Sequence, residues 1–217
     1  MSLETIISML AQGMVTSVQI FFFTLIGSLP LGLLVAFGRM SKIAPLRWLV
    51  RFYISIMRGT PLILQLFIVY FGPFYIFGIQ MGQGYRFTAT LIAFILNYAA
   101  YFAEIYRSGI ESIPRGQHEA AAVLGYSRVQ TFVRIIFPQV FKRIIPPITN
   151  EVITLVKDTA LAFTLGVAEM FTQARAIVAS QGNLIAFLIA GIFYYAFNAL
   201  VAFIMERVEK AFAYYHE

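Results

Sequence analysis

A run of about 26 residues without a formal charge, from Gly13 to Gly38, constrains the fold of this chain more than any other feature. A helix of that length rises about 39 Å, enough to cross the roughly 30 Å hydrocarbon core of a bilayer with some tilt. Composition agrees, because 60% of the 217 residues are hydrophobic, 12% are charged and the mean hydropathy is +0.80. We therefore predict an all-α membrane protein.

Four further apolar stretches divide the chain into five expected spans within one transmembrane domain, residues 1–217. Pro30 is expected to kink the first span, and the second is expected to bend near Gly59 to Pro61. The pair Pro146 and Pro147 is expected to prevent a straight fourth helix. The expected spans cover residues of about 13–38, 46–71, 87–106, 140–168 and 183–205.

Lysine and arginine gather beside the ends of the spans that face one side of the membrane, as is typical of cytoplasmic flanks. The other side carries Arg86 and Arg175, with external loops expected over residues 72–84 and 169–182. This asymmetry predicts an N-terminus outside and a C-terminus in the cytoplasm. The cytoplasmic set is Arg39, Lys42, Arg47, Arg51, Arg107, Arg115, Arg128, Arg134, Lys142, Arg143, Arg207 and Lys210.

Several function classes are excluded. The net charge of +6 comes with no nucleic-acid recognition motif, so we expect no nucleic-acid partner. Cysteine is absent, and the two histidines, His118 and His216, lie far apart in sequence, so we expect no metal site. No Walker-type phosphate loop and no nucleophile elbow occur. We expect no enzyme, and any uphill transport must draw energy from a partner or an ion gradient.

The most informative polar stretch lies in an expected cytoplasmic loop of about residues 107–138. Pro114 and Gly116 interrupt the preceding helix, a short helix is expected up to Leu124, and Gly125 stands where a left-handed C-terminal cap would fall. Such a hairpin would present the small side chains of Ala120 and Ala121, with Glu119, at an exposed corner where another protein can approach closely. The alternative is an ordinary amphipathic loop at the membrane surface.

A second short helix is expected to follow. Ser127 and Gln130 have the spacing of a capping box that would open it, and Pro138 would end it. Helical periodicity then places four apolar side chains on one face of this helix: Val129, Phe132, Val133 and Ile136.

At these residues the chain resembles a known family. Glu119-Ala120-Ala121, then Gly125 and Ile135 at fixed spacing, is similar to the EAA motif of ABC importer membrane subunits, although Phe137 stands where that family usually has leucine. Further segments, spread over about residues 50–170, resemble the permease branch for polar amino acids such as histidine, arginine, lysine, glutamine and glutamate. They are Arg58-Gly-Thr-Pro61 with Gln65, Asn97-Tyr-Ala-Ala-Tyr101 with Glu104, Arg107-Ser-Gly-Ile110, and Lys157-Asp158-Thr159.

The resemblance implies a type I ABC importer permease fold in a bacterial-type inner membrane. It also implies a second permease subunit, either another copy or a related chain, two ATPase subunits that bind ATP and magnesium, and an extracytoplasmic binding protein that delivers the amino acid. The chain itself would bind no cofactor and perform no chemistry. The residues expected to couple it to the ATPase are Arg115, His118, Glu119, Ala120, Ala121 and Gly125.

Polar residues inside the spans mark the expected substrate path: Asn97, Tyr101, Glu151, Thr154 and Asp158. The last three are spaced i, i+3 and i+7, so they share one helix face. We hypothesise that Glu151 and Asp158 attract the ammonium or guanidinium group of an amino acid, which favours arginine, lysine or histidine.

Other roles for these acids stay open. Asp158 pairs with Lys157 or another cation in one alternative, and Glu151 caps a broken helix near Pro147 in another. Glu104, three residues before Arg107, is expected to be structural. Two rival functions are an ion-coupled secondary amino acid transporter with Glu151 and Asp158 as proton sites, and an intramembrane enzyme that uses the same acidic pair.

Overall fold

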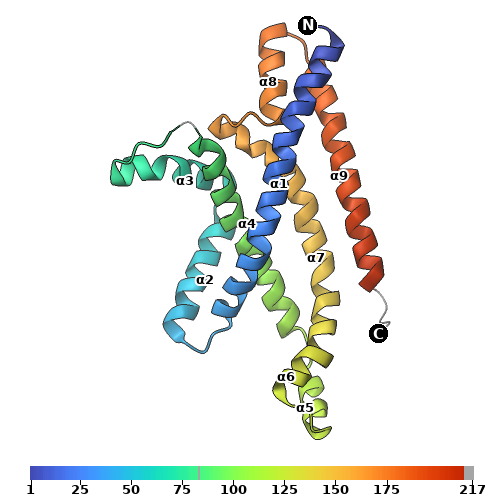
Figure 1. Cartoon of the computed structure of the whole chain (residues 1–217). Helices are drawn as coiled ribbons and strands as arrows, with labels where there is room; N and C mark the ends of the chain where they lie inside the picture. Colours follow the sequence, from blue (N-terminus) through green and yellow to red (C-terminus); the bar gives the residue numbers. More distant parts are fainter. Residues whose placement is uncertain (83, 213–217) are drawn as a thin grey trace.

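The structure, a computed structural model, describes residues 1–82 and 84–212, and the described chain is helical. Four long helices, α1 (Leu3–Arg39), α4 (Tyr85–Glu111), α7 (Phe137–Asp158) and α9 (Ile185–Phe212), run along the long axis of the molecule (Figure 1). The shorter elements are α2 (Ala44–Gly59), α3 (Leu62–Phe77), α5 (Arg115–Val123), α6 (Arg128–Thr131), a π-helical turn η1 (Phe132–Ile136), a 3₁₀ helix η2 (Thr159–Leu165) and α8 (Met170–Gln181).

Three helices, α1, α4 and α9, are long and apolar enough to cross a membrane, and α2 with α3 adds a fourth crossing if the bent pair counts as one span. Helix α7 differs because five of its 22 residues are charged. The prediction of an all-helical protein with several apolar spans is therefore confirmed, and the count of five spans stays a prediction.

Several helices run through proline residues. Helix α1 continues through Pro30, and α7 continues unbroken through Pro146 and Pro147. The kink expected at Pro30 and the departure from a straight helix expected at Pro146 and Pro147 stay predictions. The prediction that Pro138 ends the hairpin helix is wrong, because the chain stays helical from α6 through η1 into α7. In η1 the Phe137 N–H donates to the Phe132 carbonyl five residues back. This wider turn precedes Pro138, which has no N–H of its own to donate.

The two predicted external loops are partly wrong. Helix α3 extends into the first and ends at Gly78, whose φ of 68° is left-handed, and α8 fills most of the second. The expected bend in the second span is confirmed, and it is sharp: the helix direction changes by 113° between α2 and α3.

Helices α1 and α4 pack closely along small residues. A Cβ on Gly32 would lie 2.8 Å from the Phe102 Cβ, and Ala36, Ala100 and Ala103 are fully buried. Farther along α1, a Cβ on Gly13 would lie 2.7 Å from the Met170 Cα, so α8 also touches the backbone of α1. In a membrane, apolar side chains gain little by leaving lipid for a neighbouring helix, so helices associate through close packing. Small residues permit that packing because they let the two backbones approach each other.

Candidate functional site

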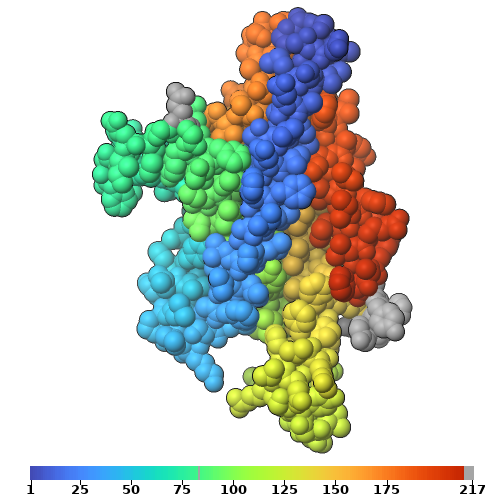
Figure 2. Space-filling model, in the orientation of Figure 1, coloured from blue at the N-terminus to red at the C-terminus, as the bar shows by residue number. Residues whose placement is uncertain are grey.

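The hairpin of α5 and α6 protrudes beyond the other helices at one end of the molecule, and the N-terminus lies at the opposite end (Figures 1 and 2). Gly125 has a φ of 77°, a left-handed backbone conformation that lets the chain reverse direction between α5 and α6. The Tyr126 N–H donates to the Ala121 carbonyl at 3.0 Å, and the Gly125 N–H donates to the Ala122 carbonyl at 3.0 Å. These two bonds form a Schellman motif, which confirms the predicted left-handed cap.

The predicted capping box at the start of α6 is also confirmed. The Gln130 N–H donates to Ser127 Oγ at 3.2 Å, and the Ser127 N–H donates to Gln130 Oε1 at 2.9 Å. Both turns of the hairpin are therefore fixed by local hydrogen bonds, which hold α5 and α6 at a defined angle.

The exposed surface of the hairpin differs from the expected one in one residue. Ala120 is exposed, but Ala121 is only 1% exposed and packs inward, where α5 contacts α6 and η1. The expectation that both alanines lie at the exposed corner is therefore wrong for Ala121. The other four expected hairpin residues, Arg115, His118, Glu119 and Gly125, are exposed.

Large apolar side chains on the hairpin are exposed as well, and two of them, Val123 and Leu124, were not singled out from the sequence. Val123 is 88% exposed and Leu124 is 73% exposed, at the C-terminal end of α5. Val129 on α6 is 73% exposed, and of the four side chains expected on one face of the second helix only Ile136 is buried. Apolar surface of this kind at a protruding tip indicates contact with another protein.

On α7, the three polar residues of the expected path are half-buried, as their shared helix face requires. Asp158 Oδ2 accepts a hydrogen bond from the Tyr98 hydroxyl at 2.8 Å. Tyr98 itself is 2% exposed in the core between α4 and α7. The partner of Asp158 is thus a phenol from the neighbouring helix, where the sequence had suggested a cation.

Glu151 has no hydrogen-bond or ion-pair partner among residues 1–82 and 84–212. Because α7 runs unbroken past Pro147, Glu151 does not cap a helix break, and that alternative is wrong. The positive charge of Arg58, at the end of α2, interacts electrostatically with the Glu151 carboxylate without forming an ion pair. A half-buried carboxylate that has no partner among the described residues is costly, which points to a functional role.

Asn97 and Tyr101 lie on α4 beside that junction. The Asn97 amide donates to the Met57 carbonyl at 3.1 Å and to Gln65 Oε1 at 3.0 Å, so it holds the bend between α2 and α3. The Tyr101 ring lies under the Arg58 guanidinium, with 5.3 Å between the guanidinium carbon and the ring centroid. Of the two, Tyr101 remains half-buried and Asn97 is 5% exposed.

Three arginines surround the carboxylate of Glu104 at the hairpin end of the bundle. Its carboxylate lies 2.6 Å from Arg107 Nη2, 3.7 Å from Arg39 Nε and 3.9 Å from Arg58 Nη1. The predicted pairing with Arg107 is confirmed, and it extends into a network that joins α1, α2 and α4.

Sequence reasoning missed Glu169, which is fully buried. Its carboxylate accepts the N–H groups of Phe171 and Thr172 at 2.7 and 2.6 Å, and so caps α8. The same carboxylate accepts the hydroxyl of Tyr194 on α9 at 3.2 Å and that of Ser17 on α1 at 3.5 Å. An acidic residue just before a helix is typical of an N-cap, but Glu169 stood in a segment that was expected to be a loop, so no helix start was predicted there.

A metal site is not formed by the described residues, in which no three His, Cys, Asp or Glu side chains come close enough to hold an ion. His216 lies outside the described residues.

Comparison with known proteins gives a consistent result. Residues 28–214 match the family described as binding-protein-dependent transport system inner membrane component. The arginine transport system permease protein ArtQ of Bacillus subtilis (strain 168) is 38% identical over 205 residues, which cover 94% of this chain and 92% of ArtQ. The L-cystine transport system permease protein TcyB of the same organism is 37% identical over 203 residues, with 93% and 85% covered.

Solved structures agree with the sequence relatives. The crystal structure of an amino acid ABC transporter with histidines has a TM-score of 0.85 at 30% identity and covers 94% of each chain. An inward-facing structure of the MetNI methionine ABC transporter, 21% identical, shares the fold with a TM-score of 0.69 and covers 98% of this chain and 100% of that chain.

Proposed function

Because the chain belongs to the binding-protein-dependent transport system inner membrane component family, as a multi-pass permease subunit of an amino acid ABC importer, we propose that it carries basic amino acids into the cytoplasm. Family membership favours the importer over the two rivals, an ion-coupled transporter and an intramembrane enzyme. An ATPase and a substrate-binding protein are the partners that such a family implies. We propose two ATPase subunits, which bind ATP and magnesium, and a second permease subunit.

The proposed topology has five spans within a single domain: α1, the bent pair α2 and α3, α4, α7 and α9. The N-terminus and the hairpin lie at opposite ends of the molecule (Figure 1), which supports an N-terminus outside if the hairpin is cytoplasmic. In this arrangement α7 crosses the membrane despite its charges, because it faces protein and the substrate path instead of lipid.

The preference for basic substrates rests on the unpaired carboxylate of Glu151. Asp158, seven residues on, has one oxygen bonded to Tyr98 and the other free of hydrogen bonds to the described residues. Thr154 lies between them on the same face. Two acids on one path favour a cationic side chain, and ArtQ, a relative of this chain, is by its name an arginine permease.

Replacing Glu151 with glutamine is expected to raise the half-saturating arginine and lysine concentrations for uptake about tenfold, which corresponds to about 1.4 kcal/mol. Uptake of glutamine, which has no side-chain charge, should change less than about twofold. The measurement is radiolabelled uptake into vesicles that contain the complete complex. Glu4→Gln, an exposed acid at the N-terminus, is the matched control. Unchanged uptake and affinity for all three amino acids would remove Glu151 from the path.

The hairpin is proposed as the ATPase contact, with Val123 and Leu124 as its apolar anchors beside Glu119. Truncating Leu124 to alanine is expected to weaken ATPase association about tenfold, because a leucine side chain buried in an interface contributes about 1.5–3 kcal/mol. Titration of purified ATPase onto the reconstituted permease measures this. Leu184→Ala is the control, since Leu184 is 65% exposed but lies in the segment that links α8 and α9, at the end opposite the hairpin. Equal ATPase affinity for the wild type and Leu124→Ala would contradict the proposed contact.

In the proposed cycle, ATP-driven closure of the ATPase dimer draws the two hairpins together. Rigid-body motion of the permease helices then switches the substrate path between its inward- and outward-facing states. The permease contributes binding and motion, and it contributes no covalent step.

A further inference from the structure

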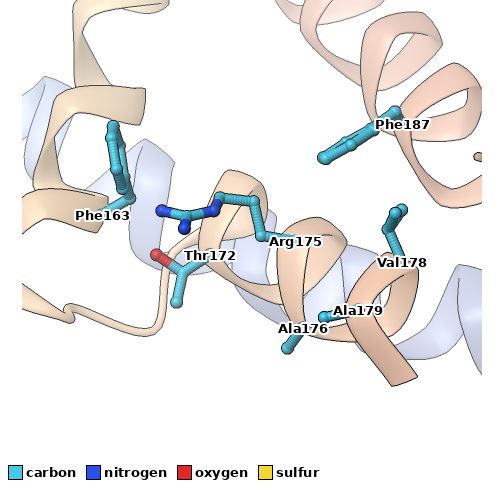
Figure 3. Close-up of a pocket in the computed structure, with 7 residues that line it drawn as sticks. All are labelled: Phe163, Thr172, Arg175, Ala176, Val178, Ala179 and Phe187. Carbon is cyan, nitrogen blue, oxygen red and sulfur yellow. The ribbon is translucent and has the colours of Figure 1, made fainter. Parts of the chain in front are cut away.

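A cavity of about 470 Å³ lies at the end of the molecule opposite the hairpin. It is formed by one face of α8 together with an aromatic ring from η2 and another from α9 (Figure 3). This volume is in the range of small-molecule sites. Its lining residues are Phe163, Thr172, Arg175, Ala176, Val178, Ala179 and Phe187.

Arg175 is the charged residue of this lining. Its guanidinium carbon lies 4.8 Å from the centroid of the Phe163 ring, and Figure 3 shows the guanidinium between Phe163 and Thr172. The stacking covers one face of the guanidinium and leaves N–H groups at its edge. No acidic residue in the described part of the chain pairs with it.

The acidic residue closest to Arg175 in sequence already has hydrogen-bond partners. Glu169, six residues before Arg175, is fully buried, and both of its oxygens accept hydrogen bonds at the start of α8. Thr172 donates its hydroxyl hydrogen to Glu169 Oε1 at 2.8 Å, so the hydroxyl oxygen is left with acceptor capacity only. The cavity therefore contains the guanidinium of Arg175 as a cationic donor and the hydroxyl of Thr172 as a neutral acceptor, surrounded by apolar side chains.

That combination suits the backbone end of an amino acid. A guanidinium pairs with a carboxylate through two parallel N–H donors, and a hydroxyl oxygen accepts a hydrogen bond from an ammonium group. Every amino acid carries this pair of groups, so a site of this kind would hold substrates independently of their side chains.

The position of the cavity relative to α7 is the second argument. Phe163 lies five residues beyond Asp158 along η2, a distance of about 10 Å at the 2.0 Å rise of a 3₁₀ helix. The carboxylate of Asp158 thus lies at the start of η2, beside the substrate path. Near the other end of η2, the Phe163 ring contacts the guanidinium of Arg175 in the outer cavity. A basic amino acid carries the complementary arrangement, with a carboxylate at one end and a cation at the other.

We propose that the cavity around Arg175 is an outer binding site for the α-carboxylate of the amino acid, occupied before the side chain reaches Asp158 and Glu151. The proposal rests on the proposed amino acid transport. It adds a site that recognises what all substrates share, whereas the acids on α7 select the side chain.

The absence of cysteine allows a direct test. Ala179→Cys places a thiol in the lining of the cavity, and its rate of alkylation by a small maleimide reports occupancy in the complete complex. Free arginine at millimolar concentration is expected to slow alkylation about fivefold, and agmatine, which lacks the carboxylate, should leave the rate unchanged. Adding Arg175→Gln should remove the protection by arginine. Ala176→Cys, also exposed in the lining, replaces the first reporter if that variant fails to assemble.

Gln80→Cys, on the exposed segment after α3, controls for general effects on labelling. Equal slowing at Gln80, equal protection by agmatine, or protection that survives Arg175→Gln would overturn the proposal. Protection by the substrate-free binding protein without protection by arginine would also overturn it, because the occupant would then be a carboxylate of that protein. A complex that transports arginine but shows no protection refutes only this site. A complex that transports no amino acid refutes the proposed function.

Discussion

Replacing Gly125 with valine is expected to lower ATP-driven uptake at least about thirtyfold while the permease still inserts into the membrane. Gly125 joins α5 to α6 at a φ of 77°, a conformation that a β-branched residue resists by about 1–2 kcal/mol or more. The turn is expected to leave this conformation and break the two Schellman bonds to Ala121 and Ala122. Since α5 and α6 are proposed to contact the same ATPase, a change in their angle misaligns the whole contact.

Gly125→Asn is the matched variant, because asparagine tolerates left-handed backbone conformations far better than valine does. It should keep uptake within about twofold of the wild type. Uptake and ATP hydrolysis are measured on the same proteoliposomes, with permease content normalised by quantitative blotting. Wild-type uptake by the valine variant, or equal losses in both variants, would show that the backbone conformation of Gly125 is not what the coupling requires.

Replacing Glu169 with alanine is expected to destabilise the permease by about 3–5 kcal/mol, as is typical when one partner of a buried charged network is removed. Two N–H groups of α8 would lose their acceptor, and so would the hydroxyls of Ser17 and Tyr194. For a chain of this size the midpoint of thermal unfolding should fall by roughly 10 °C. Thermal denaturation in detergent, followed by intrinsic fluorescence, measures the shift.

Two further variants define the origin of that effect. Glu169→Gln keeps the size of the side chain but places an amide NH₂ where an acceptor is needed, so it should retain most of the destabilisation. Glu4→Ala removes an exposed acid from the first turn of α1 and should cost less than about 1 kcal/mol. A shift of under 2 °C for Glu169→Ala would mean that the network contributes little to holding α8 on α1 and α9.

The parts of the fold that were predictable from sequence are those fixed by neighbouring residues. The left-handed cap at Gly125 and the capping box of Ser127 and Gln130 depend on bonds that span three to five residues. Long uncharged apolar runs predict membrane helices for a similar reason, since a lipid-exposed backbone must satisfy its own hydrogen bonds. These features are therefore legible without any knowledge of the tertiary structure.

What was missed depends on contacts between distant residues. Glu169 meets Ser17 across 152 positions, so its place in a segment expected to be a loop gave no sign of burial. Ala121 and Ala120 are equivalent by pattern, and only the packing of α5 on the following turn makes one of them inaccessible. Asn97 is a polar residue in an apolar span, and its role at the α2 and α3 junction is visible only once Met57 and Gln65 are in place.

Because α1 and α4 pack closely along small residues, we expect the two helices to move as one rigid body. Helix α4 ends three residues before Pro114, the cap of α5, and α1 extends about 55 Å by its 37 residues to the end where Gly13 meets Met170. Backbones in such close contact have little room to slide. If the hairpin contacts the ATPase as proposed, we expect a displacement of the hairpin to reach α8 through the backbones of α4 and α1, without a chain of rearranging side chains between them.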